Sequence, residues 1–247
     1  MKIIISPAKQ MRTDLEGMAP VGLPVFLDEA NTILAVLRSM TLEELQNLWC
    51  CNAAIAQLNF ERLQKMCLES AVTSAIEAYD GIQYKYMAPG VFENGEFSYV
   101  QEHLRILSGF YGVLRPLDAV TPYRLEMQAK LKIGASKHLY DYWGAKLYKE
   151  VVDESRIIIN LASKEYSKCI EKYLQPEDIY ITCVFGELAG SKVVQKGVYA
   201  KMARGEMVRY MAERCIEDVE ALKDFNYLGY AFSQEYSKKN EFVFLRA

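Results

Sequence analysis

Basic side chains gather in short segments whose chemistry suits an anionic ligand. Six basic residues stand against two acidic ones between positions 103 and 137, in a chain of net charge −3. This stretch contains Arg105, Arg115 and Arg124 among prolines and glycines that fix loop conformation. A guanidinium offers a planar fork of donors that pairs with two phosphate or carboxylate oxygens. The stretch therefore predicts an anion site, with a solvated and internally paired surface as the alternative.

Salt bridges are the structural alternative for two of these arginines. Arg115 precedes Asp118 by three residues, and Arg124 precedes Glu126 by two. Each pair could neutralise itself and orient its own loop, so charge alone leaves both interpretations open.

Two other segments place polar groups where an apolar strand ends. Ser6 and Lys9 follow the β-branched run at 2–5, and Ser163 and Lys168 follow the apolar run at 156–162. Ser163 is placed to cap a helix, whose first amides and partial positive charge favour an anion. A solvated lysine and a plain helix cap are the alternatives.

Asn160 lies inside that second apolar run and needs a hydrogen-bond partner if it is buried. On a predicted helix further along, Lys201 and Arg204 are three residues apart and share one face. Gly205 beside them would let a ligand or another backbone approach closely. A solvated basic helix face is the alternative there.

The elements that must position these groups give an α/β pattern. Turn signals also bound a Gly-x-x-Gly loop at 109–112 and a capping box from Thr41 to Glu44. Ile55, Leu58 and Leu63 are expected to face the core. Strands are predicted at 2–6, 156–162, 179–185, 192–195, 227–232 and 241–245, and helices at 27–40, 52–66, 98–107, 139–152 and 199–215. We expect one α/β (α+β) domain over residues 1–247, a mixed β-sheet covered by helices.

Bulk features exclude several function classes. The longest apolar run is far shorter than the ~18 to 20 residues that cross a bilayer, which predicts a cytoplasmic protein without membrane contact. Six cysteines lack C-x-x-C spacing, and the two histidines lack metal-ligand spacing. The sequence therefore predicts no disulfides, no metal and no cofactor. Common phosphate-loop, dinucleotide, nucleophile-elbow and zinc-protease motifs are missing from it.

Five motifs, taken together, resemble one known family. They are Ile-Ser-Pro-Ala-Lys at 5–9, Leu-Ser-Gly-Phe-Tyr-Gly-Val-Leu-Arg-Pro-Leu-Asp at 107–118, Pro-Tyr-Arg-Leu-Glu-Met at 122–127, Asn-Leu-Ala-Ser-Lys-Glu-Tyr at 160–166 and Ala-Arg-Gly at 203–205. The order and content of these motifs resemble the YaaA family (UPF0246, DUF328). Gln128, Ser167 and Met202 depart from the family pattern, and Met202 replaces a basic residue.

The resemblance implies a cytosolic peroxide (oxidative) stress protein that limits iron-dependent damage. It also implies a positively charged cleft, a helix-hairpin-helix element and binding to duplex or branched DNA. The hairpin has two candidate places, 107–113 and 41–66. The cations in matching positions are Lys9, Arg105, Arg115, Arg124, Lys168, Lys201 and Arg204, and the supporting polar groups are Ser6, Tyr123, Glu126, Asn160 and Ser163.

A second hypothesis is an enzyme acting on a small anionic substrate, such as a nucleotide or phosphorylated metabolite. Mixed polar groups near strand ends are more than shape-only DNA binding needs, and an acidic chain suits a small ligand better than a polyanion. Which of these two functions applies depends on whether the basic segments converge in space.

Overall fold

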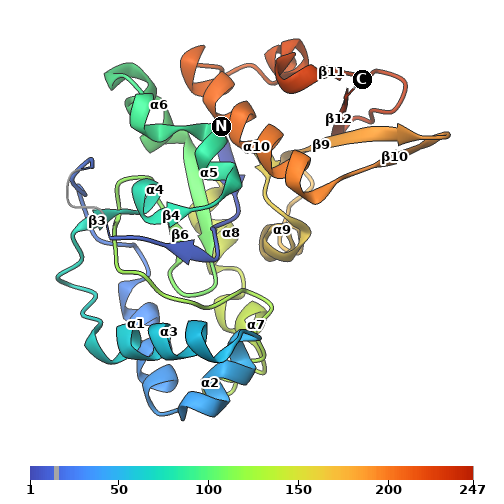
Figure 1. Cartoon of the computed structure of the whole chain (residues 1–247). Coiled ribbons are helices and arrows are strands. Elements are labelled where there is room, and N and C mark those ends of the chain that lie inside the picture. Colours follow the sequence, from blue (N-terminus) through green and yellow to red (C-terminus); the bar gives the residue numbers. More distant parts are fainter. Residues whose placement is uncertain (14–16, 247) are drawn as a thin grey trace.

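A mixed β-sheet forms the centre of the computed structural model, which describes residues 1–13 and 17–246 (Figure 1). The strand order is β11-β12-β9-β8-β1-β5-β6, and β10 pairs with β9. The five strands from β12 to β5 run parallel to their neighbours, while β6, β10 and β11 are antiparallel additions. The strands of this sheet are β1 (Lys2–Ile5), β5 (Leu104–Ser108), β6 (Gly112–Leu114), β8 (Ile157–Leu161), β9 (Ile179–Ala189), β10 (Lys192–Val194), β11 (Tyr230–Phe232) and β12 (Glu241–Arg246).

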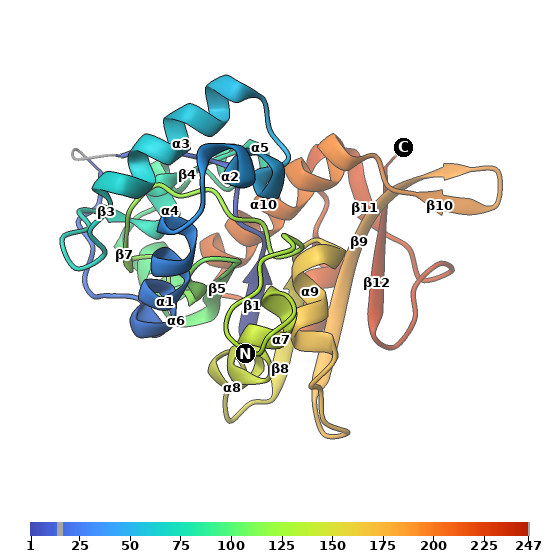
Figure 2. The same cartoon turned by 90° about the horizontal axis from the view of Figure 1, so that it is seen from below.

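Two short ribbons and a set of helices surround the sheet. The ribbons are β2 (Gln10–Met11) with β4 (Tyr79–Asp80) and β3 (Thr73–Ser74) with β7 (Ala119–Val120). Helices α1, α2 and α3 cluster together beside the sheet, and α10 runs along its other end (Figures 1 and 2). The helices are α1 (Leu27–Arg38), α2 (Leu42–Trp49), α3 (Ala53–Lys65), α4 (Ala75–Ala78), α5 (Ile82–Met87), α6 (Asn94–His103), α7 (Leu139–Trp143), α8 (Lys146–Val151), α9 (Lys164–Glu171) and α10 (Gly197–Glu213), with 3-10 turns η1 (Pro89–Val91), η2 (Val219–Asp224) and η3 (Tyr227–Gly229).

The predicted α/β class with a mixed sheet is confirmed, and so is the capping box. Thr41 accepts from the Glu44 amide, and the Glu44 carboxylate accepts from the Thr41 amide. The predicted strands all occur, with shifts of a few residues at their ends.

The helix predicted at 98–107 is wrong at its C-terminal end. Helix α6 stops at His103, and Leu104–Ser108 is a fully buried strand. The spacing of Val100, Leu104 and Leu107 fits a helix, but the short apolar cluster of Leu104, Ile106 and Leu107 also fits a buried parallel strand. No helix was predicted for residues 82–97, where α5 and the start of α6 lie.

Two smaller expectations also fail. The helix predicted at 139–152 divides at Gly144, whose φ of 52° lies in the left-handed region. On α3, Leu63 is buried, whereas Ile55 and Leu58 are 37% and 49% exposed, so the core-facing stripe is narrower than predicted. Sequence spacing gave the right helix there but the wrong face for two residues.

Strand β1 has parallel partners on both sides: β5 on one and β8 on the other. The chain reaches β5 first and only later crosses to β8, so the strand order reverses at β1. In open parallel sheets, such a switch leaves a crevice at the carboxyl ends of the strands, because the following loops leave in opposite directions. Ser6, after β1, and Ser163, after β8, therefore lie at the same sheet edge.

Gly205 allows α10 and α5 to pack backbone against backbone. A Cβ at this position would lie 2.1 Å from the Gln83 carbonyl oxygen and 2.9 Å from the Met87 amide nitrogen. The close approach foreseen at Gly205 is thus to another backbone. It places Lys201 and Arg204 beside the first turn of α5.

Gly205→Ala should destabilise the protein by about 1–3 kcal/mol, because the added methyl overpacks a contact between two backbones. Urea unfolding measures the loss. Gly197→Ala is the matched control on the same helix: nothing lies within 4 Å of its added Cβ, so it should be neutral or slightly stabilising. Equal stability of the two variants would contradict this account of the packing.

Candidate functional site

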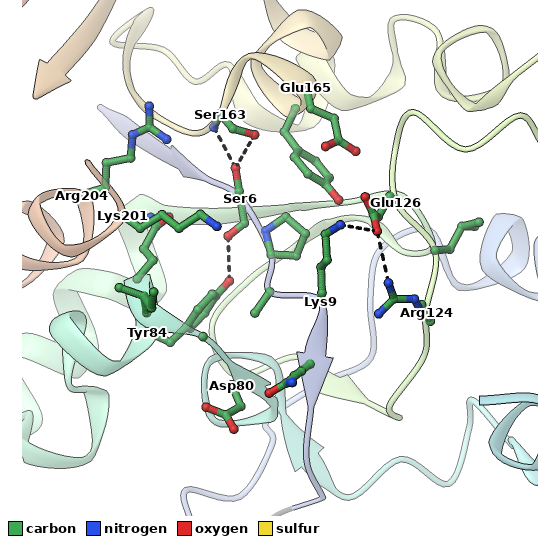
Figure 3. A pocket seen from close by; sticks show the side chains of 18 of the residues that line it. Ser6, Lys9, Asp80, Tyr84, Arg124, Glu126, Ser163, Glu165, Lys201 and Arg204 are labelled. Carbon is green, nitrogen blue, oxygen red and sulfur yellow. Dashed lines mark hydrogen bonds and ion pairs between the residues drawn. The ribbon is translucent and has the colours of Figure 1, made fainter. Parts of the chain in front are cut away.

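A cavity of about 380 Å³ opens at the carboxyl ends of β1 and β8 (Figure 3). Its walls come from the segment after β1, the β4–α5 junction, the loop at 123–126, the start of α9 and one face of α10. All four polar segments identified in the sequence thus contribute to the cavity, the 105–126 stretch only through residues 123–126. The predicted residues that line the cavity are Ser6, Lys9, Tyr123, Arg124, Glu126, Ser163, Lys201 and Arg204.

Ser6 and Ser163 join the two strand ends. The Ser163 amide donates to Ser6 Oγ over 2.8 Å, and the two hydroxyl oxygens are 3.2 Å apart. Ser163 is the N-cap residue of α9, but its side chain does not accept from the helix amides, contrary to the capping role predicted for it. Tyr84 fixes the same turn from α5 by donating its hydroxyl to the Ser6 carbonyl over 3.1 Å.

One side of the cavity is balanced in charge. Glu126 Oε1 forms ion pairs with Lys9 at 2.9 Å and with Arg124 at 3.6 Å, so the salt-bridge interpretation of Arg124 is confirmed (Figure 3). Glu165 lies beside them and accepts from the Gln128 amide at 3.2 Å. Burial raises the pKa of Glu165, and the negative charge of Glu126 raises it further. A carboxyl group of raised pKa near a lysine is suited to proton transfer.

The α10 side of the cavity is not balanced. Within residues 1–13 and 17–246, Lys201 and Arg204 form no ion pair and no hydrogen bond through their side chains, and the buried Nε of Arg204 has no partner. Burial lowers the pKa of Arg204, because a low-dielectric surrounding disfavours the charged form. Sharing one helix face, as predicted, these two cations form the positively charged end of the cavity (Figure 3).

Sequence reasoning missed several residues of the site. Asp80, Gln83 and Tyr84 come from the β4–α5 junction, for which the sequence predicted neither an element nor a site, and Glu165 lies two residues after Ser163. Gln83 is only 7% exposed, and its side-chain Nε2 has no hydrogen-bond partner. The Asp-Gly dipeptide at 80–81 is a signal that could have marked a tight strand-to-helix turn.

Four predicted site residues lie elsewhere. Lys168 is exposed on α9 and lines a separate, open depression with His138 and Tyr140. Asn160 is buried, and its side chain has hydrogen-bond partners. Its side-chain Nδ2 donates to Thr182 Oγ1 at 3.2 Å, and its side-chain Oδ1 accepts from the Ala162 backbone amide at 2.9 Å.

Arg105, on β5, and Arg115, just after β6, belong to a structural cluster outside the cavity. Arg115 pairs with Glu150 at 3.6 Å, while the Asp118 carboxylate accepts from the Arg115 backbone amide at 2.8 Å. Arg105 is 5% exposed and donates to the Gln101 and Leu104 carbonyls. The pairing of Arg115 with Asp118 thus runs through the backbone, and neither arginine lines the cavity.

The first candidate place for a helix-hairpin-helix, 107–113, does not have that form. It is the turn between antiparallel strands β5 and β6, with Gly112 at φ 75°. Residues 41–66 do hold two helices, α2 and α3, joined through Cys50 in the left-handed region. Within the described part of the chain, no cluster of three or more metal-type side chains occurs, and no helix is long and apolar enough to cross a membrane.

Asp118 should make stability depend on pH. Burial raises its pKa to about 6 from an ordinary value of 3.8, so the fold favours its protonated form. This contribution to the free energy of unfolding is full below about pH 4 and is lost as the pH rises through about 6. Compared with Asp118→Asn, the wild type should therefore lose stability between these pH values in urea titrations. A constant difference between the two proteins would contradict the shift.

Comparison with known proteins agrees with this arrangement of motifs. The family described as "Peroxide stress protein YaaA" matches residues 1–236. A UPF0246 protein of Agathobacter rectalis is 59% identical over 246 residues, covering 100% of this chain and 99% of the relative. UPF0246 proteins of Desulfitobacterium hafniense and Pediococcus pentosaceus are 56% and 48% identical, and each match covers 100% of this chain and 98% of the relative. The chain therefore belongs to the peroxide stress protein YaaA family.

Proposed function

We propose that this peroxide stress protein binds a small anionic molecule in the cavity beside α10 and acts on it as an enzyme. The observation that carries the proposal is Arg204, a half-buried arginine whose buried Nε has no hydrogen-bond partner and whose guanidinium has no carboxylate partner among residues 1–13 and 17–246. Burying a cation is unfavourable unless a counter-charge compensates it. A bound anion would supply that counter-charge between Arg204 and Lys201.

Catalytic groups for such an enzyme are present on the opposite wall. Glu165, whose pKa is raised, and the Lys9–Glu126 pair line the same cavity as the free cations. An anion held at α10 would expose its remaining atoms to these groups, which can donate or accept a proton. Position at the sheet's switch point agrees with the usual place of ligand sites in parallel sheets.

DNA binding is the second candidate. Lys9 and Lys201 are exposed at the cavity, where a phosphate backbone could reach them. Against an extended DNA track, Arg105 is buried and Arg115 is paired with Glu150. Protection from iron-dependent damage and a cytoplasmic location stay predictions from the family resemblance.

Replacement of Arg204 separates stability from binding. Arg204→Gln should be at least as stable as wild type in urea, because an unpaired buried charge is removed. Its affinity for pyrophosphate, measured by calorimetry beside inorganic phosphate and citrate, should fall at least about tenfold. Arg209→Gln is the control, since Arg209 pairs with Glu213 on the same helix outside the cavity. No binding of any of these anions to the wild type would contradict the proposal.

DNA binding has its own test in fluorescence anisotropy with duplex and branched DNA at ~50 and ~200 mM salt. Phosphate contacts release counterions, so true DNA binding should weaken steeply over this range. Loss of that binding in a Lys9→Gln/Lys201→Gln variant would place DNA at the cavity mouth. Tight anion binding without DNA binding would instead leave the small-ligand enzyme as the function.

A further inference from the structure

We infer that the anion is carried by a nucleotide: the cavity binds one nucleoside 5′-phosphate unit, with the phosphate at Lys201 and Arg204 and the base read by Gln83. This inference rests on the proposed anion-binding function of the same cavity. It adds a ring and an orientation to the anion, and both follow from the cavity walls that α5, the segment after β1 and the loop at 123–126 provide.

The cavity has two chemically different ends. Arg204 lies at one end and Asp80 at the other (Figure 3). A carboxylate at the second end repels an anion and accepts hydrogen bonds, so the ligand must carry donors there. Within the described residues, Asp80 forms its ion pair with Lys85, at 3.5 Å, and Lys85 is largely exposed to solvent. An anion at one end and N–H or O–H donors at the other describe a nucleotide, whose base and ribose supply the donors.

The wall between the two ends is aromatic and apolar. Tyr84 and Tyr123 line it, with Pro7 and Leu125 alongside. Neither tyrosine offers its hydroxyl to a ligand: Tyr84 donates to the Ser6 carbonyl, and the Tyr123 hydroxyl lies 2.6 Å from Ser108 Oγ and 2.8 Å from the Tyr79 hydroxyl. The rings therefore present apolar surface. A sugar phosphate would leave hydroxyls unpaired against them, whereas a base has an apolar face that packs on them.

Gln83 supplies the second, independent observation. Its side chain is more than nine-tenths buried, lines the cavity, and holds an amide Nε2 without a partner. Leaving such a donor unsatisfied is unfavourable, so a ligand atom that accepts from it strengthens binding. Side-chain amides recognise the polar edges of nucleobases through this kind of contact. The buried donors Arg124 Nε and Arg204 Nε line the same cavity, which fits a ligand rich in acceptors.

Size agrees with this ligand class. The cavity volume of about 380 Å³ lies within the range of small-molecule sites, roughly 300–1,000 Å³. A single nucleotide can come from two sources, a free mononucleotide or a nucleotide turned out of a strand, and enzymes that work on bases in DNA bind an extruded base in such a pocket. The shared chemistry is one phosphate, one ribose and one base.

Calorimetric titration of the full chain tests the inference with five probes: the common nucleoside 5′-monophosphates, the matching nucleosides, ribose 5-phosphate, inorganic phosphate and a single-stranded oligonucleotide. At least one mononucleotide should bind about tenfold or more tightly than both its nucleoside and ribose 5-phosphate. Gln83→Leu, which keeps the volume but removes the amide, should weaken that nucleotide by about tenfold and leave ribose 5-phosphate unchanged. Arg204→Gln should weaken both ligands, and Arg209→Gln neither.

The outcomes separate this inference from the proposal beneath it. If ribose 5-phosphate or inorganic phosphate binds as tightly as every nucleotide, base recognition is overturned while the small-anion function stands. If no phosphate-bearing probe binds, both are overturned. Binding of the oligonucleotide with loss in Gln83→Leu identifies a nucleotide within a strand as the source, and binding of the mononucleotide alone identifies the free form. Melting curves of each variant without ligand show that Gln83→Leu is folded.

Discussion

Pairing of β1 with parallel strands on both sides determines where chemistry can occur in this protein. Residues Ile3, Ile4 and Ile5 pair with β5 on one side and β8 on the other, and all three are fully buried. Because both neighbours are parallel, the chain leaves all three strands at one edge of the sheet. Ser6 is the first residue beyond that edge, and its hydroxyl accepts the amide that begins the turn into α9. The cavity is thus built into the register of the sheet.

Position alone does not make the site, because a second contact must bring α10 to that edge. Gly205 provides it by letting α10 approach the backbone of α5. One helix pair then carries the free cations on one partner and Gln83 and Tyr84 on the other. A side chain at position 205 would move the cations away from the amide and the aromatic wall together. The packing of α10 and the geometry of the ligand site therefore both depend on the absence of a side chain at Gly205.

Local sequence patterns predicted those parts of the site that lie within one strand end or one helix face. The strand at 2–6 delivered Ser6 and Lys9 to a sheet edge, and the three-residue spacing of Lys201 and Arg204 placed them on one face. Arg105 was wrongly predicted to bind an anion because it is close in sequence to Arg115 and Arg124, whereas the fold buries it and brings Glu150 near it from another segment. Asp80 and Gln83 could not be found, since only the tertiary pairing of β4 with β2 and of α5 with α10 brings them to the cavity. Periodicity also cannot separate a buried strand from a buried helix, which explains the error at Leu104–Ser108.

Two arginines outside the cavity, the partly exposed Arg156 and the buried Arg105, provide the comparison for Arg204. Arg156 pairs with Glu177 at 3.2 Å and Asp178 at 2.6 Å. Burial lowers the pKa of Arg105, and the negative charges of Glu150, Glu102 and Asp118 raise it. Among the described residues, the charge effect that opposes burial at Arg204 comes from Cys183, a buried thiol whose own pKa is raised to about 12 and which is therefore neutral. Carboxylates thus act on Arg156 and Arg105, whereas within residues 1–13 and 17–246 none pairs with Arg204. A cation left in that state, facing a cavity, has an anionic ligand as its natural counter-charge.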